Sequence, residues 1–217
     1  FAAILAVSFW TFACSIWREE SKNLLPRQIN IYKNVLASII FFPVIFTINW
    51  SIELNALFFL IISGVVGIAI GDTLYINSLK IIGTRKTLTF ESLTPIIATI
   101  LSTLSINQIY PKQVWIGCLI VSVSLWMIER QNTQQKDNSR EMRFFGIICA
   151  LGSVFCAVFA ALISRIVLTT TTLTPLQTTE IRLLSSAICL CLFFKSDFFD
   201  LFRIRSTKIK SHSGLIL

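Results

Sequence analysis

The chain has 217 residues, of which 54% are hydrophobic and only 14% are charged, and its mean hydropathy is +0.75. An average soluble protein has roughly 45–50% apolar and about 25% charged residues, so this composition excludes a water-soluble globule and a disordered segment. The net charge of +8 does not predict a nucleic-acid partner, because the Lys and Arg residues stand in short stretches between apolar runs. Such stretches set the orientation of a membrane protein and contact anionic lipid. We therefore expect an integral membrane protein.

Long apolar runs predict helical spans, because a bilayer core about 30 Å thick needs about 20 helical residues and no run alternates as a barrel strand does. The seven runs are 1–17, 31–50, 56–79, 87–106, 113–128, 144–164 and 183–194. The seventh is too short unless it begins near Leu176, which would bring Glu180 and Arg182 into the helix. An eighth run begins at 211–217. We therefore predict an all-α membrane protein with about seven complete transmembrane helices plus the start of an eighth, and a chain that is a fragment of a longer protein.

The basic residues of the connections alternate along the chain. Lys and Arg gather after the first, third, fifth and seventh spans, whereas the connection after the second has none and that after the fourth has Lys112 alone. This asymmetry places the odd connections in the cytoplasm. Several aromatic residues fall near the predicted helix ends, where amphipathic rings favour the membrane interface; they are Trp17, Tyr32, Trp50, Tyr110, Trp115 and Trp126.

The first two spans resemble the sixth and seventh. In each pair the first span ends at an Arg, a connection with a Pro follows, and a basic residue stands at the start of the next span. The matching residues are Arg18 with Arg165, Pro26 with Pro175, and Lys33 with Arg182. Repeats of five helices insert in opposite orientations, which is the inverted-repeat layout of many secondary transporters. We predict a first repeat at 1–128, a polar linker at 129–143 and a truncated second repeat at 144–217.

Three consecutive stretches bear a family resemblance. They read GIAIGDTLYINSLKIIGTRK, TLTFESLTPIIATILSTLSINQ and QVWIGCLIVSVSLWM. They resemble the third to fifth helices of an EamA-type repeat of the drug/metabolite transporter superfamily, in the segment that ends at Gly83, in the Leu-Thr-Pro step at Pro95 and in Gly117 at the start of the fifth helix. Asp72 matches one branch of that family, whereas Gln108 stands where the family usually has Glu.

This resemblance implies a secondary transporter with ten helices in its full-length relatives, so that this chain would lack most of the last three. It also implies that both termini lie in the cytoplasm. The loop charges argue the opposite, so the sequence leaves the orientation in the membrane open.

Asp72 is the strongest candidate for a functional side chain. A charged residue at the centre of a span costs about 2.5–3.5 kcal/mol on insertion scales. Such a carboxyl can bind a proton or a cationic substrate in one state and release it in another. Tyr75 lies one turn further on the same side of the helix, so both residues can face one cavity. The alternative is an Asp near the membrane edge that is hydrated and uninvolved.

The fourth span contains Glu91 and Pro95. Because Pro95 has no N–H, the carbonyl of Glu91 loses its helical donor, and a broken helix of this kind can coordinate an ion in a transporter. A kink that serves helix packing alone is the alternative.

Two basic residues near helix ends are candidates for gates or substrate anchors. For Lys33 we favour an ammonium that extends to the membrane interface. Arg182 would lie deeper, and Glu180 is two residues away, so the two cannot pair well on one helix. Each of them would then need a partner elsewhere.

Small residues recur every four positions at Ser63, Gly67 and Gly71, which predicts a face where helices approach closely. The six Cys lie within apolar runs without CxxC spacing and are expected to fill space. No residue pattern indicates a catalytic site, a metal site or a cofactor.

The sequence thus predicts a multi-pass secondary transporter of a small organic metabolite in the plasma or inner membrane, and not an enzyme. Asp72, with Tyr75 and Glu91, would form the site for the solute, with or without a coupled proton. A homodimer is compatible with the sequence. The alternatives are a membrane-embedded lipid-modifying enzyme and a non-transporting membrane assembly protein.

Overall fold

The computed structural model describes residues 2–48, 53–106, 110–130 and 140–197, and all the regular structure in these ranges is helical. The helices are α1 (Ala2–Glu20), α2 (Pro26–Phe41), η1 (Phe42–Thr47), α3 (Leu54–Gly64), η2 (Val65–Gly71), α4 (Asp72–Ile82), α5 (Thr84–Glu91), α6 (Thr94–Ile106), α7 (Lys112–Arg130), α8 (Arg140–Thr170) and α9 (Pro175–Phe193). η1 is a 3₁₀ helix and η2 is a π-helix.

Several of these helices join into long apolar segments. Five segments are long and apolar enough to cross a membrane, namely Pro26–Thr47, Leu54–Ile82, Thr84–Ser105, Arg140–Thr170 and Pro175–Phe193, and α7 contains a shorter apolar stretch at Lys112–Ser124. Each of the seven predicted runs therefore contains a helix, with α1 at the first, and the all-α membrane architecture is confirmed. The predicted eighth run lies outside the described residues.

Capping sets the start of two helices. α2 begins at Pro26, a residue suited to the first turn because it has no N–H to leave unpaired, and the Leu25 N–H donates to Gln28 Oε1 at 3.0 Å. This start is five residues earlier than predicted. α9 begins at Pro175 after the N-cap Thr174, whose hydroxyl accepts from the Gln177 N–H. The predicted extension of the seventh helix toward Leu176 is therefore confirmed.

Helical structure extends into both ends of the predicted linker at 129–143. α7 continues to Arg130 and α8 begins at Arg140. Residues 131–139 lie outside the described residues.

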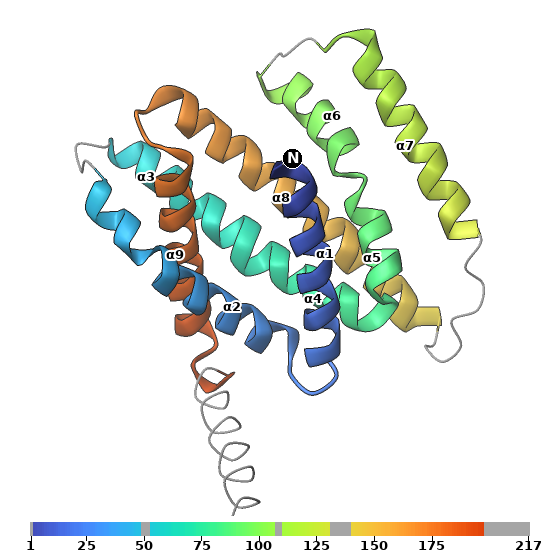
Figure 1. Cartoon of the computed structure of the whole chain (residues 1–217), viewed down its shortest axis with the longest axis horizontal. Coiled ribbons are helices and arrows are strands. Elements are labelled where there is room, and N and C mark those ends of the chain that lie inside the picture. The colour runs from blue at the N-terminus through green and yellow to red at the C-terminus, as the bar shows by residue number, and fades with distance from the viewer. Residues whose placement is uncertain (1, 49–52, 107–109, 131–139, 198–217) are drawn as a thin grey trace, which may run out of the picture.

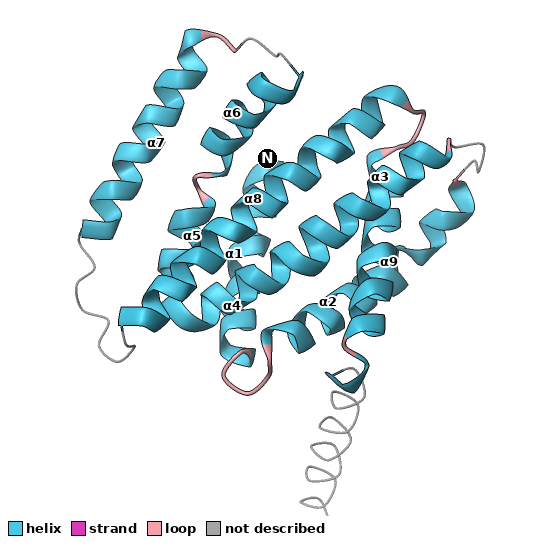
Figure 2. Ribbon diagram, turned by 180° about the vertical axis from the view of Figure 1, so that it is seen from behind, coloured by secondary structure: helices cyan, strands magenta, loops and turns pink. Residues whose placement is uncertain are grey.

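The connections alternate between two ends of the molecule (Figures 1 and 2). In Figure 1 the turns after α1 and α4 lie toward the lower side, and the turn after α8 lies toward the upper side. α8 is the central helix and contacts α3, η2, α4, α5 and α6, whereas α7 lies at one edge. α9 is antiparallel to α2: Arg27 Nε meets Asp197 Oδ2 at 2.5 Å at one end, and Gln177 Nε2 donates to the Thr47 carbonyl at 2.8 Å at the other.

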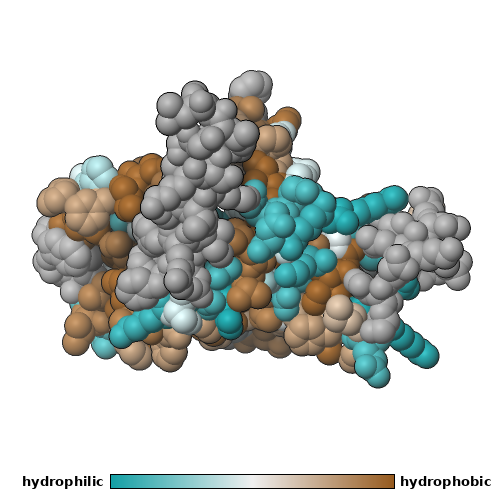
Figure 3. Space-filling view, turned by 90° about the horizontal axis from the view of Figure 1, so that it is seen from below, coloured by the Kyte–Doolittle hydropathy of each residue, from teal (hydrophilic) through white to brown (hydrophobic). Residues whose placement is uncertain are grey.

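Large apolar side chains cover the outside of the helices. Examples that are more than half exposed are Phe9, Ile39, Phe46, Phe58 and Leu119. The lower end of the molecule differs, since hydrophilic residues gather there between the apolar ones (Figure 3). This distribution suits an apolar middle in lipid tails and a polar end at the headgroups.

The small-residue face at Ser63, Gly67 and Gly71 meets α8. The Ser63 hydroxyl donates to the Ala160 carbonyl at 2.8 Å and lies 2.9 Å from Ser164 Oγ. A β-carbon at Gly67 would stand 2.5 Å from Ala160 Cβ, and one at Gly71 would stand 3.1 Å from Cys156 Cβ. Small residues on both helices therefore let the two backbones approach closely.

Gly64 provides a test of this close approach, because a β-carbon there would clash with Ser185 Oγ and stand 2.5 Å from the Arg182 carbonyl oxygen. We expect Gly64→Ala to lower the free energy of unfolding by about 1–3 kcal/mol, as overpacking does. Thermal unfolding in detergent measures the change. Gly117→Ala is the control, because nothing lies within 4 Å of its added methyl group. An equal loss in both variants would contradict this account of the helix contact.

Candidate functional site

α1 presents one face to the centre of the molecule. Trp10, Cys14 and Trp17 recur at positions i, i+4 and i+7, so they share a side of the helix. The Cys14 side chain is fully buried and packs with Tyr75 and Leu79 of α4. The ring of Trp10 contacts that of Trp17, with centroids 5.4 Å apart, and lies 5.8 Å from that of Tyr75. These residues form an aromatic wall.

An ion pair between Lys33 of α2 and Asp72 of α4 lies against this wall. Lys33 Nζ contacts Asp72 Oδ2 and lies 5.0 Å from the centroid of the Trp17 ring. The two side chains are only 21% and 27% exposed. Asp72 stands about 15 Å from the last residue of α4 at about 1.5 Å per residue, which is close to the middle of a bilayer core. Each charge thus has an opposite partner at a depth where an isolated charge is costly.

The sequence favoured a Lys33 ammonium that extends to the membrane interface, and the structure pairs this ammonium with Asp72. Because α2 begins at Pro26, Lys33 lies two turns inside the helix and not at its start. The nearest compensation for its charge is the Asp72 carboxylate, and the Trp17 ring adds a cation–π contact. Trp17, for which the sequence predicted an interfacial position, is part of the same arrangement.

Glu91 of α5 forms a second polar centre beside the first. Tyr75 Oη donates to Glu91 Oε2 at 2.8 Å, and Trp10 Nε1 donates to the same oxygen at 3.2 Å. Cys14 Sγ lies 3.1 Å from Tyr75 Oη. Asp72 is close enough for its charge to act on Glu91. The structure therefore brings together the carboxyl groups of Asp72 and Glu91, their partners Lys33 and Tyr75, and the indole rings of Trp10 and Trp17. We call these six residues the polar cluster.

Pro95 does not join the polar cluster. The helix breaks at residues 92–93 between α5 and α6, and the Pro95 ring is exposed. The Glu91 carbonyl is not free, as the sequence had suggested, because the Thr94 hydroxyl donates to it. A side chain has taken the place of the missing backbone donor, so this carbonyl has no need of an ion.

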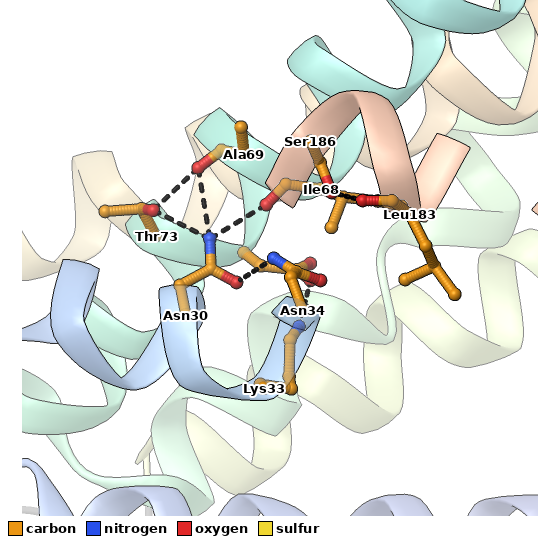
Figure 4. Close-up of polar contacts among 9 residues, drawn as sticks. Asn30, Lys33, Asn34, Ile68, Ala69, Thr73, Leu183 and Ser186 are labelled. Atoms are coloured by element: carbon orange, nitrogen blue, oxygen red, sulfur yellow. Dashed lines mark hydrogen bonds and ion pairs between the residues drawn. The ribbon is translucent and has the colours of Figure 1, made fainter. Parts of the chain in front are cut away.

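The π-helical segment η2 provides a different set of backbone oxygens. Asn30 Nδ2 of α2 donates to the carbonyls of Ile68 at 2.9 Å and Ala69 at 3.2 Å, and to Thr73 Oγ1 at 2.9 Å (Figure 4). Asn34 Nδ2 in turn donates to Asn30 Oδ1 at 2.9 Å. π-helical turns are rare and occur frequently at functional sites. One amide from α2 therefore holds the irregular turn that comes directly before Asp72.

Sequence reasoning did not identify Asn30, Asn34, Trp10 or Cys14. Helical spacing was an available signal: Asn30, Lys33 and Asn34 share one face of an otherwise apolar helix. Ser38 continues this face to a hollow between α2 and α9, whose other lining residues are Val35, Ile39, Phe42, Leu184 and Ala187. The side-chain oxygens Asn34 Oδ1 and Ser38 Oγ are buried without a hydrogen-bond partner.

Glu180 and Arg182 of α9 do not pair with each other. Glu180 is fully buried, and both of its carboxyl oxygens lack a hydrogen-bond partner. Arg182 lies beside η2, where a β-carbon on Gly67 would stand 3.3 Å from its Nη2. Among the residues that the structure describes, no three His, Cys, Asp or Glu side chains gather as a metal site would need.

A family comparison identifies the family of the chain. The sequence profile of the EamA-like transporter family matches residues 1–130. The chain belongs to the EamA-like transporter family. No significantly similar protein was found among curated proteins or among solved structures. The protein is thus a multi-pass membrane protein of a transporter family, and the match covers all the helices of the polar cluster.

The amide of Asn30 is open to a direct test. We expect Asn30→Ala to lower the free energy of unfolding by about 1–3 kcal/mol, since buried polar groups lose their partners. The amides of residues 65–71 should then exchange hydrogen faster, which mass spectrometry of the exchanged protein detects. Leu36→Ala is the control, because this side chain of the same helix is 46% exposed. Unchanged exchange in residues 65–71 would show that Asn30 does not hold η2.

A double-mutant cycle measures the ion pair. We expect Lys33→Met and Asp72→Asn each to destabilise the protein, and the double variant to lose less than their sum by about 0.5–3 kcal/mol, because neither partner is then left alone. The control cycle uses Lys22→Met and Glu19→Gln, an ion pair whose side chains are 63% and 70% exposed. Its coupling should be close to zero. Additive effects at Lys33 and Asp72 would contradict the pairing.

Proposed function

We propose that this protein is a secondary transporter that moves a small organic solute by alternating access, with the polar cluster as its solute site. The observation that supports this most is the ion pair between Lys33 and Asp72 in the interior of a membrane span. Intramembrane charges are rare and generally mark solute, ion or proton pathways. The membership of the EamA-like family makes transport the natural use of such a pair.

The pair can exchange partners with a solute. A charged solute group that contacts Asp72 or Lys33 replaces an ion pair whose side chains are already mostly buried. Little further desolvation of these two side chains is therefore needed. A ligand changes a conformational equilibrium only through its different affinity for the two states. The Lys33–Asp72 ion pair joins α2 to α4. A solute that replaces this ion pair can therefore change the relative position of the two helices.

Glu91 extends this proposal to a coupled proton. Its carboxyl group accepts hydrogen bonds from Tyr75 and Trp10, and the negative charge of Asp72 acts on it. Two carboxyl groups that repel each other favour a state in which one of them holds a proton. Solute binding at Asp72 would then change the proton affinity of Glu91.

The proposed movement uses the two predicted repeats. α8 and α9 run in the opposite directions to α1 and α2 across the molecule (Figure 1), as an inverted repeat requires. Ser63, Gly67 and Gly71 bring α8 close to the first repeat, and we place the proposed movement of the second repeat relative to the first at this contact.

Other parts of the proposal follow from the family. Transport is favoured over a lipid-modifying enzyme and over a non-transporting assembly protein, because the family consists of transporters. We place the protein in the plasma or inner membrane, with a homodimer as a further hypothesis.

Substitution of Asp72 tests the solute site. We expect Asp72→Asn to abolish flux of the solute that a screen of the full-length protein identifies, because the exchangeable charge is lost. Asp72→Glu should retain part of the flux. The measurement is uptake into proteoliposomes, with the amount of folded protein determined by size-exclusion chromatography. Glu19→Gln, at an exposed carboxylate, is the control and should transport normally. Normal flux in a well-folded Asp72→Asn protein would remove Asp72 from the mechanism.

A further inference from the structure

Arg182 has a charge for which the described residues provide no dedicated partner. It forms none of the ion pairs found in the described part of the chain. Its Nε is buried and makes no hydrogen bond. The residue lies about 10 Å along α9 from Pro175 at about 1.5 Å per residue, and therefore well inside the membrane span. A guanidinium has five N–H donors and is always charged, so a position of this kind requires an acceptor.

Nearby carboxyl groups are already engaged or face elsewhere. Asp72 is close enough for its charge to act on Arg182, but its Oδ2 contacts Lys33. Glu91 accepts its hydrogen bonds from two other side chains. Glu180 is two residues from Arg182, which is about 200° around the helix. The nearby carboxylate whose charge acts on Arg182 is thus already paired with Lys33.

The guanidinium of Arg182 packs against the backbone of η2. The guanidinium lies against Gly67 of η2, where a β-carbon would stand 3.3 Å from Nη2. Arg182 comes from the second predicted repeat, whereas Lys33 and Asp72 come from the first. Arg182 and the Lys33–Asp72 pair therefore belong to different sides of the interface that the proposed movement opens and closes.

We propose that Arg182 binds an anionic group of the transported solute, a carboxylate or a phosphate monoester, and that Asp72 competes with this group for the two cations. The planar fork of an arginine matches both anions through two parallel N–H bonds. This inference rests on the proposed function and adds the substrate class to it. Organic cations are the contrary class, and they would be drawn to the Asp72 carboxylate instead.

Anion binding to the purified full-length protein tests the proposal. The thermal unfolding temperature is measured in uncharged detergent with acetate, succinate or inorganic phosphate, and with choline at the same ionic strength. We expect the anions to raise the unfolding temperature of the wild type, and choline to leave it unchanged. Arg182→Gln should weaken anion binding by about 10-fold or more, and Arg182→Lys, which keeps the charge without the fork, should weaken it less. Arg165→Gln, an exposed arginine at the other end of the repeat motif, is the control and should bind as the wild type does.

A second arm separates a solute from a lipid. Soluble glycerol phosphate and short-chain phosphatidic acid both carry a phosphate monoester, and we expect only the former to stabilise the wild type in an Arg182-dependent way. Stabilisation by the lipid alone, by choline, or by anions equally in Arg182→Gln would overturn the proposal.

The Asp72→Asn variant distinguishes this inference from the proposed function. It should bind anions at least as tightly as the wild type, because the competing carboxylate is gone, while its flux is lost. Loss of anion binding in Asp72→Asn would contradict the competition. Normal flux in that variant, with anion binding still dependent on Arg182, would overturn the proposed function of Asp72 and leave the anion site in place.

Discussion

The arrangement of the residues at the centre of this molecule follows from the high free energy of an unpaired charge in a low-dielectric interior. A charged side chain within a bilayer must find an opposite charge or hydrogen bonds inside the protein. Lys33 and Asp72 satisfy each other, and the bond between them fixes α2 against α4. Trp17 of α1 then covers the ammonium, and the neighbouring Trp10 reaches Glu91. Four helices thus meet at the polar cluster because few other places could hold its charges.

The same constraint applies to the backbone. Carbonyls that lose their helical donor in an apolar layer need another one. The Thr94 hydroxyl fills this role at the break before Pro95. In η2, the Asn30 amide donates additional hydrogen bonds to the carbonyls of Ile68 and Ala69. In both places a polar side chain permits an irregular turn next to a carboxyl residue. The irregular turns and the charged groups are therefore one structural feature.

The part of the site on the second predicted repeat is less complete. Arg182 Nε and both carboxyl oxygens of Glu180 have no hydrogen-bond partner, whereas Asp72 is paired with Lys33 and Glu91 accepts from Tyr75. Under the proposed function this difference has a use, because groups that bind a solute must keep hydrogen-bonding capacity while the groups around them hold their positions. The small residues of α3, η2 and α8 bring the two parts close together.

The sequence by itself determined the helices and their order. Apolar runs of the length of a bilayer, and the Pro and Thr residues that cap α9, act locally and can be recognised without a fold. It also indicated Asp72, Tyr75 and Glu91, because an isolated charge in an apolar run is conspicuous. It could not determine that Lys33 is the partner of Asp72, that Asn30 holds η2, or that Trp10 donates to Glu91. These contacts join residues that are far apart in the chain, and only the crossing of the helices brings them within hydrogen-bond distance.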